Sequence, residues 1–424
     1  MVQAIAVVFS YQYPGKYALN VLAGAIESRP ELDTVELHFP RNGEALETAA
    51  RSALQRGCKT VVAWSSYSPS FPQTVSELKA LRASLGDRFL AITGGVHAIG
   101  ETRDALDGGF DLVCTGEGER SLIDLLLRLH EGRDPLEAIG FARRVEGKEV
   151  RTPRGEPVQL DEFPAFAARH RQMGAIEITR GCIYACRFCQ TPFASKAKFR
   201  HRSVDDITHW IRTLRAAGKR DVRFISPTSL SYGASGETPD LHAVEELLVK
   251  AREAAGPEGR LYFGTFPSEV RPEHVTPEAM ALLKRYVDND NLIIGGQSGS
   301  ERVLEQSRRG HGVEAIVRSA RVALEGGFVP NVDFILGLPG EGPEEIAQTV
   351  ALMKQLAGLG AKVHGHTFMP LPGTPFRDQA PGRISEETKL ELERLASRQV
   401  LYGQWKAQEA VAAEIASRAR LLRG

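Results

Sequence analysis

The chain has 424 residues, enough for two or three domains with separate cores, and its composition, 42% hydrophobic and 25% charged, is ordinary for a globular protein. Lys and Arg total 53, as do Asp and Glu, so the formal net charge is zero and gives no reason to expect nucleic acid as a partner. No apolar run reaches about 18 residues and no leader pattern opens the chain, which predicts a cytoplasmic protein without a membrane span.

The first 132 residues alternate apolar strands with amphipathic helices. We expect strands at 4–9, 34–39, 60–64, 89–93 and 112–115, and helices at 17–28, 45–57, 74–84, 102–107 and 120–130. Five consecutive strand–helix units predict an α/β fold with a doubly wound, flavodoxin-like (Rossmann-like) parallel sheet. Ligands of such sheets bind beyond the carboxyl ends of the strands.

The loops at those ends read SYQYPG, SSYSPS, GGVHA and TGEGE, and their glycines let backbone approach a large flat ligand. This stretch, 94–127 above all, resembles the cobalamin-binding domain that precedes the catalytic barrel in one subclass of radical S-adenosylmethionine (SAM) enzymes. The resemblance implies cobalamin contacts from Ser10, Gln12, Ser65, Ser66, Gly94, Gly95, His97, Gly116, Glu117, Gly118 and Glu119.

One departure from the cobalamin-binding pattern lies in the first loop. Where many such domains carry DxHxxG, this chain has Ser10 and Gln12 in place of the aspartate and histidine, so no histidine of this loop binds cobalt from below. The alternative is a flavodoxin-like domain without cofactor that positions substrate. Cys58 and Cys114 are expected as small buried residues beside strands.

Residues 133–172 are predicted to link two domains. They include a hairpin within 141–155 that turns at Glu146 and Gly147. The LDEFPAF segment at 160–166 resembles the short entry found before many radical SAM barrels.

Three cysteines follow a predicted strand at 176–179 and the breaker Gly181. Cys182, Cys186 and Cys189 form CxxxCxxC, and three thiolates can hold three irons of a [4Fe–4S] cluster while leaving one iron open. Zinc and reduced structural thiols are the alternatives, but zinc normally takes four ligands and no second pair is near.

This spacing, with an aromatic residue before the third cysteine, resembles the radical SAM superfamily. The resemblance implies that SAM binds the open iron, that Phe188 lies beside the adenine, and that the cluster's electron breaks SAM to give a 5′-deoxyadenosyl radical. It also implies an electron donor such as flavodoxin or ferredoxin and a reducing compartment.

Residues 173–375 contain six predicted strands, at 176–179, 222–226, 261–266, 292–296, 329–336 and 362–368. This count is that of the partial (β/α)6 barrel of radical SAM enzymes, whose active site lies at the carboxyl ends of the strands. A helix is expected to begin at Ser203, which has a capping pattern. The PLPGTP run at 370–375 resembles the ending shared by cobalamin-binding members and methylthiotransferases.

The loops after these strands carry residues that resemble the family's SAM-binding motifs. They are Ser226, Ser268, Glu269, Arg271, Gln297, Ser298 and Gly337, together with Phe188. Arg271 is a candidate for the SAM carboxylate because a guanidinium pairs with a carboxylate through two hydrogen bonds; the alternative is a surface arginine at a helix start. Ser300 is expected to cap the next helix, and Arg308, Arg309 and His311 are expected in a solvated basic turn.

Residues 376–424 are predicted as helices that pack against the barrel. The whole pattern predicts a cobalamin-dependent radical SAM methyltransferase that acts on an unactivated carbon of a small molecule or peptide, through a 5′-deoxyadenosyl radical and methylcobalamin. A non-methylating rearrangement or cyclisation is one alternative, and a cluster-bearing scaffold or sensor is another. A tRNA methylthiotransferase is a third, opposed by the presence of only two cysteines in the first domain, where that family needs three.

Overall fold

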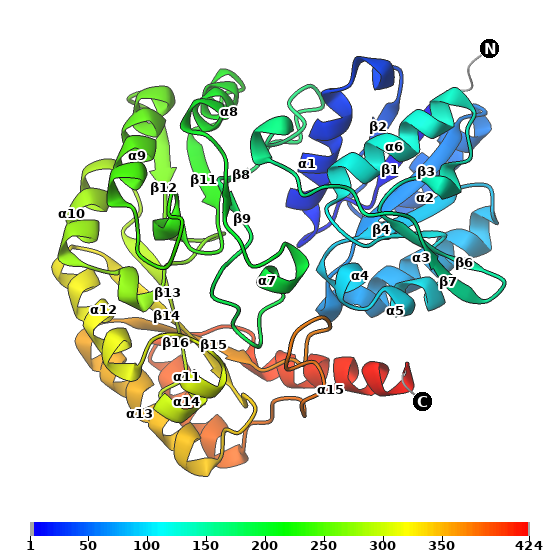
Figure 1. Cartoon of the computed structure of the whole chain (residues 1–424). Helices are drawn as coiled ribbons and strands as arrows, with labels where there is room; N and C mark the ends of the chain where they lie inside the picture. The colour runs from blue at the N-terminus through cyan, green and yellow to red at the C-terminus, as the bar shows by residue number, and fades with distance from the viewer. Residues whose placement is uncertain (1–3, 423–424) are drawn as a thin grey trace. The chain divides into compact units, whose positions relative to one another are not determined.

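The computed structural model describes residues 4–422, which form two compact units divided after Gly174. Strands alternate with helices in both units, and the helices lie along the faces of the strands (Figure 1). Among the described residues, no helix is long and apolar enough to cross a bilayer.

The first unit is built on a seven-stranded sheet in the order β2-β1-β3-β4-β5-β6-β7, of which the first five strands are parallel. The parallel strands are β1 (Ile5–Phe9), β2 (Glu36–His38), β3 (Lys59–Ser65), β4 (Leu90–Gly94) and β5 (Leu112–Cys114). The helices are α1 (Lys16–Glu27), α2 (Gly43–Gln55), α3 (Phe71–Leu85), α4 (Val96–Gly100), α5 (Thr102–Asp107) and α6 (Gly118–Glu131). The order of the parallel strands is that of flavodoxin, so the predicted doubly wound sheet is confirmed.

Strand β1 is buried on both faces, as expected for a parallel strand covered by helices. Val7 and Phe9 pack into one core cluster with Leu125 of α6. Val8 points the other way and packs into a second cluster with Leu78 of α3. The continuous apolar run of β1 therefore supplies two cores, one on each face of the sheet.

The predicted hairpin of the expected linker is part of this sheet. It consists of β6 (Phe141–Val145) and β7 (Lys148–Arg151), and its turn has positive φ at Glu146 and Gly147. Strand β6 pairs with β5 in antiparallel register, Val113 against Ala142. Residues 133–172 thus lie within the first unit and do not form a free connection, because the open edge of β5 accepts the hairpin.

The two cysteines of the first unit are buried, as predicted, but far apart along the sheet. Cys58 directly precedes β3, and Cys114 is the last residue of β5. Because β3 and β5 run parallel within one sheet, the two thiols lie at opposite ends of the strands.

The second unit contains the expected barrel strands. They are β8 (Ile176–Glu177), β11 (Asp221–Ile225), β12 (Arg260–Tyr262), β13 (Asn291–Gln297), β14 (Val329–Leu336) and β15 (Lys362–Thr367), with a small antiparallel pair of β9 (Thr179–Arg180) and β10 (Arg200–His201). The order is β8-β11-β12 and β13-β14-β15, all parallel, and a bridge between Val270 and Ile294 joins the two runs. The predicted partial (β/α)6 barrel is confirmed.

The helices of this unit follow the strands around the barrel (Figure 1). They are α7 (Thr191–Ala194), α8 (Val204–Ala216), α9 (Leu241–Ala255), α10 (Pro277–Tyr286), α11 (Glu301–Gln306), α12 (Val313–Glu325), α13 (Pro343–Leu359), α14 (Glu386–Ser397) and α15 (Trp405–Leu421). Ser203 caps α8 as predicted, its side chain accepting the N–H of Asp206 at 3.2 Å.

Strands β14 and β15 place several polar side chains on the inside of this barrel. In β14, buried and partly exposed residues alternate strictly, with Val332 and Phe334 buried and Asp333 partly exposed. His364 and His366 occupy the equivalent face of β15. Since the side-chain period of a strand is two, the apolar face packs against the helices and the polar face lines the interior.

The segment 376–424 contains helices α14 and α15, as predicted, and also a two-residue strand that the sequence does not predict. This strand, β16 (Leu401–Tyr402), pairs in parallel with β15, Val363 against Leu401. Trp405 is 4% exposed and packs on Gly365, so the expected packing against the barrel is confirmed.

Candidate functional site

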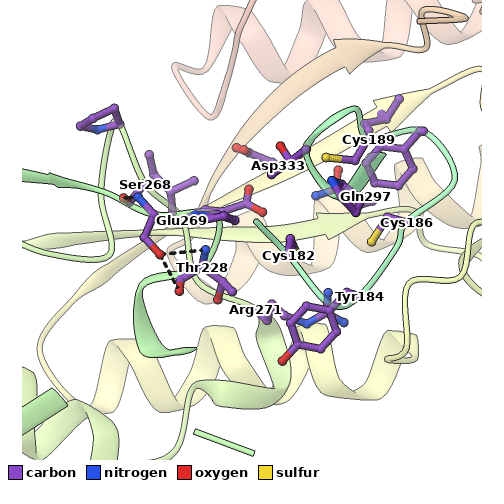
Figure 2. A pocket seen from close by; sticks show the side chains of 18 of the residues that line it. Cys182, Tyr184, Cys186, Cys189, Thr228, Ser268, Glu269, Arg271, Gln297 and Asp333 are labelled. Atoms are coloured by element: carbon purple, nitrogen blue, oxygen red, sulfur yellow. Dashed lines mark hydrogen bonds between the residues drawn. The ribbon is translucent and has the colours of Figure 1, made fainter. Parts of the chain in front are cut away.

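A cavity of about 680 Å³ lies inside the barrel of the second unit. It is lined by the loop that carries the three cysteines, by the loops after β11 and β12, and by residues of β13, β14 and β15. Figure 2 shows the labelled side chains around this space, which we call the barrel cavity. The cavity is where the predicted cluster ligands and most of the predicted SAM contacts meet.

The cysteine loop begins at Gly181, where the backbone has φ +81° and a Cβ would lie 2.1 Å from the carbonyl oxygen of Lys198. Only glycine fits such a position without strain. The loop is held at its far end by Gln190, whose Nε2 donates to the Pro372 carbonyl at 2.8 Å. The PLPGTP segment therefore has a structural role here, because it anchors the cysteine loop.

Cys182, Cys186 and Cys189 all line the barrel cavity. Burial raises the pKa of the Cys182 thiol to about 11 and also raises that of Cys189. Iron binds the thiolate and would displace these protons. The donor set fits a [4Fe–4S] cluster, since three converging sulfurs face a cavity with room for a further ligand on the fourth iron.

Arg309 is buried at 4% exposure beside these cysteines, so the prediction of a solvated turn is wrong for this residue. Its Nη1 donates to Cys186 Sγ at 3.5 Å, and its Nη2 donates to the Gly295 carbonyl at 2.6 Å. A side chain on Gly295 would collide with this guanidinium, because the Cβ would lie 2.4 Å from Nη2. Arg308 is exposed as predicted. His311 is only partly exposed, and burial lowers its pKa to about 4.

Arg271 is 2% exposed, which excludes a surface arginine even though a short helix does begin after it. Its Nε donates to Glu273, one Nη donates to the Arg309 carbonyl, and the guanidinium lies 3.6 Å from the ring centre of Tyr184. These contacts fix Arg271 against the cysteine loop at the cavity wall. Tyr184 lines the cavity and is hydrogen-bonded at 3.0 Å to His274, and neither residue is predicted from the sequence.

Ser226 and Ser268 line the barrel cavity, but their hydroxyls are used within the protein. Ser268 Oγ donates to the Phe224 carbonyl at 2.8 Å and accepts the Ser226 N–H at 2.9 Å. Ser226 Oγ donates to the Thr228 carbonyl at 2.9 Å. The buried hydroxyl of Thr228 has no hydrogen-bond partner among the described residues, which suits it to a polar ligand.

Glu269 and Gln297 present functional groups to the cavity. Burial raises the pKa of Glu269 to about 7, although the positive charge of Arg309 opposes this shift. Gln297 lies at an irregularity of β13 with φ +77°, a strained conformation for a residue with a side chain. Such strain is common where a side chain must be aimed at a ligand.

Two of the predicted SAM contacts do not line the cavity. Ser298 is fully buried; its hydroxyl lies 3.3 Å from that of Thr349 and accepts the Ser300 N–H at 3.2 Å. Gly337, at φ +74°, packs against residues 382 and 383. Ser300 precedes α11 but its side chain makes no capping bond. Phe188 does line the cavity and also packs against a small cluster that includes Phe368.

The sequence reasoning also misses Asp333, His364 and His366, which line the cavity. The available signal is the alternation of β14 and β15, which places all three on the interior face. Burial lowers the pKa of His366.

In the first unit, several predicted cobalamin contacts are engaged inside the protein. Ser10 and Gln12 both donate to Glu77, at 2.7 Å each. Ser66 is fully buried with its hydroxyl 2.6 Å from that of Thr93. Gln12 therefore does not extend freely from the loop.

His97 and the two acidic residues among these predictions are likewise held within the unit. His97 is not a loop residue: it lies in α4, buried, with Nε2 3.2 Å from Asp104 Oδ2 and the ring stacked on Phe71. Glu117 accepts the Val158 N–H at 2.8 Å, and Glu119 is buried in α6.

The glycines at the carboxyl edge of the first sheet differ in how much space surrounds them. A Cβ on Gly95 would lie 2.8 Å from the Ser66 carbonyl and one on Gly118 2.9 Å from Leu22. A Cβ on Gly94 would lie 3.3 Å from Cys114, whereas one on Gly116 would meet no atom within 4 Å. Gly116 and the partly exposed Ser65, Gly94 and Gly95 thus lie at the carboxyl edge of the sheet with little side-chain bulk, which is compatible with the approach of a flat ligand.

Residues 176–353 match the family model of the radical SAM superfamily. The chain is also similar to two curated tRNA-2-methylthio-N(6)-dimethylallyladenosine synthases. That of Pelobacter propionicus is 27% identical over 296 residues, 68% of this chain and 65% of the relative. That of Shewanella denitrificans is 30% identical over 257 residues, 56% of this chain and 50% of the relative. The chain thus spans about half to two thirds of the length of these relatives.

Two solved structures share the fold of the whole chain. The radical SAM methyltransferase TsrM from Kitasatospora setae, with cobalamin and a [4Fe–4S] cluster bound, has a TM-score of 0.72 and 19% identity, covering 90% of this chain and 75% of its own. The cobalamin-dependent radical SAM enzyme OxsB with aqua-cobalamin bound has a TM-score of 0.66 and 16% identity, covering 94% of this chain and 56% of its own. Residues 176–353 thus form a radical SAM domain, and most of the chain has the fold of these two radical SAM proteins.

Proposed function

We propose that the chain is a cobalamin-dependent radical SAM methyltransferase that adds a methyl group to an unactivated carbon. The observation that carries the proposal is that Cys182, Cys186 and Cys189 line one barrel cavity together with polar side chains such as Glu269 and Gln297. When bound, the cluster would supply an electron, SAM the 5′-deoxyadenosyl radical and cobalamin the methyl group.

The chain's own residues would hold and orient these groups. Glu269 and Gln297, with the orphaned hydroxyl of Thr228, would take the polar groups of SAM, and Phe188 would contact its adenine. The buried arginines Arg271 and Arg309 would keep the cysteine loop in place. A radical formed inside the barrel cavity would be partly shielded from water by the walls of the barrel.

Cobalamin is assigned to the carboxyl edge of the first unit, where Gly116 borders open space. The absence of a histidine at position 12, and the engagement of Gln12 by Glu77, would leave the lower face of cobalt without a ligand from this loop. The substrate we propose is a small molecule or a peptide, and the electron donor a flavodoxin or ferredoxin.

The first experiment is anaerobic purification with iron, sulfide and hydroxocobalamin supplied, followed by metal analysis and by absorption and EPR spectra after free cofactor is removed. We expect about one cobalt and one [4Fe–4S] cluster per chain. A cluster without cobalt contradicts the cobalamin assignment. Production of 5′-deoxyadenosine with the labelled methyl group recovered only in methionine and unreacted SAM, and none in the product, would instead support a non-methylating rearrangement or cyclisation.

A tRNA methylthiotransferase is the second candidate, favoured by the two curated relatives. It is opposed by Cys58 and Cys114, which lie at opposite ends of parallel strands and cannot share a second cluster. Iron content separates the two functions. About four irons per chain support the methyltransferase, and about eight support the methylthiotransferase.

A further inference from the structure

A second group of potential metal ligands lies in the wall of the barrel cavity, apart from the cysteines. Asp333 on β14 is the register partner of His364 on β15, and His366 follows two residues later on the same face. Asp333 Oδ1 lies 3.0 Å from His364 Nδ1, which lies 3.2 Å from His366 Nε2. The three ligand atoms all lie within 4.8 Å of one another. We call these residues the Asp-His-His triad.

Contacts with neighbouring groups orient the triad. Gln408 accepts the Thr367 N–H through Oε1 at 2.8 Å, and its Nε2 lies 3.4 Å from His366 Nδ1. His366 Nε2 faces His364 Nδ1, and His364 Nδ1 faces Asp333 Oδ1. A cation placed among these three atoms would interact with all of them.

The triad is held in place by its surroundings, as a metal site requires. The ring of Tyr402 stacks on His364 with the centroids 4.5 Å apart and the planes at 10°. Gln408 supports His366 from behind, and the paired strands fix the backbone of all three ligands. The side chains of Asp333 and His364 are 16% and 27% exposed, on the cavity side.

We propose that Asp333, His364 and His366 bind a divalent first-row transition metal ion of the Zn²⁺ class inside the barrel cavity, separate from the cysteine cluster. Two histidines and one carboxylate are a common ligand set for such ions, at about 2.0 to 2.2 Å from the metal. Three protein ligands leave a coordination position open, and here it would face the cavity. An oxygen or nitrogen of the substrate can bind there, so the ion would orient the substrate. This site does not depend on the identity of the reaction.

The test uses the full-length chain with Cys182, Cys186 and Cys189 all changed to alanine, so that no thiolate competes for metal. Anaerobic titration with Co²⁺ alone is followed by its d–d absorption and by calorimetry. We expect one Co²⁺ per chain, competed by Zn²⁺, and at least a hundredfold loss of affinity in His364→Ala. The matched control, His209→Ala, changes an exposed histidine of α8 in the same unit and should bind as tightly as the parent.

The variant Gln408→Glu is expected to raise the affinity for Co²⁺, whereas His364→Ala is expected to lower it. A metal-bound His366 carries its proton on Nδ1, which faces the amide nitrogen of Gln408 and would find a better partner in a carboxylate. The glutamate can still accept the Thr367 N–H. We expect Co²⁺ affinity to rise about tenfold, within the range known for outer-shell partners.

If the triple-alanine chain does not fold, the same site is tested in the holoprotein with its cluster intact. After dialysis against Zn²⁺ and removal of free metal, we expect one zinc per chain, absent from His364→Ala and present in His209→Ala. No Co²⁺ or Zn²⁺ binding, or binding that survives His364→Ala, overturns the proposal.

Discussion

At the scale of single residues, Arg309 is the side chain whose position most affects the proposed cluster. A buried guanidinium is costly unless its charge is paired. Arg309 contacts Cys186 Sγ and the Gly295 carbonyl, and Glu269 lies close enough to affect its pKa. The negative charge of an iron–sulfur cluster would complete this pairing. Arg309 is therefore expected to be a positioning residue that also sets the electrochemistry of the cluster.

Replacing Arg309 with glutamine should lower the reduction potential of the cluster, because a positive charge and a hydrogen bond to a ligand sulfur are lost. An EPR-monitored redox titration measures the midpoint directly and does not need substrate. Arg308→Gln is the matched control, since Arg308 is adjacent in sequence but exposed. Equal midpoints for the Arg309 and Arg308 variants would show that Arg309 does not act on the cluster.

Residues close in sequence are predicted best. The cysteine spacing alone locates the cluster ligands, because three ligands within one loop need no tertiary information. Arg309 could not be placed, since its partner Cys186 is 123 residues away in sequence and a run of Arg, Arg and Gly is typical of exposed turns. The prediction that Ser298 contacts SAM is wrong although Ser298 is adjacent in sequence to a residue that lines the cavity. Its neighbour Gln297 faces the cavity, and a strand sends the next side chain elsewhere.

At the scale of elements, the cysteine loop depends on Gly181, which has positive φ and a close contact with the Lys198 carbonyl. Gly181→Ala should displace the loop and reduce the iron content after reconstitution well below that of the parent. Gly218→Ala is the control, with a similar φ of +77° but open space around the new Cβ. It should lose some thermal stability while keeping its iron. Full iron content in Gly181→Ala would mean that the loop tolerates the shift.

The turn between β14 and α13 carries a pH-dependent contribution to stability. Burial raises the pKa of Glu341 from 4.5 to about 7, although the Gly337 N–H donates to its carboxyl group. The unfolded chain therefore loses this proton at a lower pH than the folded chain. The free energy of unfolding should fall as pH rises from about 4.5 to about 7, and should be greatest below this window.

Glu341→Gln removes the titration and keeps a carbonyl acceptor for Gly337. Its chemical denaturation midpoint should change less between pH 5 and pH 8 than that of the parent chain. Glu344→Gln, at an exposed position of α13, serves as the control and should follow the parent. If Glu341→Gln also follows the parent, Glu341 is not the source of the pH dependence.

Helices and strands are predicted correctly where the apolar pattern is long. They are missed where only pairing with a strand distant in sequence makes a segment a strand. The eight residues of β14 alternate fully and are predicted with both ends correct. Strand β16 has two residues, and only its pairing with β15 makes it a strand. The hairpin of β6 and β7 is predicted correctly, but its membership of the first sheet depends on the open edge of β5.

At the scale of the whole molecule, two units carry two kinds of site, and the sequence predicts this division because each unit has its own series of strands and helices. If the cofactor assignments are correct, each cofactor can be removed without the other. A Cβ on Gly116 would meet no atom within 4 Å, so Gly116→Leu adds a side chain at the edge of the first sheet where the corrin is proposed to lie. We expect it to lose cobalt while keeping its cluster.

The reciprocal variant, Cys186→Ala, should keep cobalt, lose the cluster and make no 5′-deoxyadenosine. Gly358→Leu, in α13 and with equally open surroundings, is the control for adding a leucine and should retain both cofactors. Metal analysis and absorption spectra of the three variants check the prediction. Retention of cobalt in Gly116→Leu would place the corrin elsewhere.

The short strand β16 has a further consequence for β15. The N–H and C=O groups along the outer side of an edge strand are a template on which another chain can pair. Leu401 and Tyr402 occupy that side of β15 next to Val363 and His364, and Trp405 covers Gly365. The two residues of β16 and the first residue of α15 thus cover part of the edge of β15. We expect this cover to oppose pairing of β15 with a strand of a second copy of the protein.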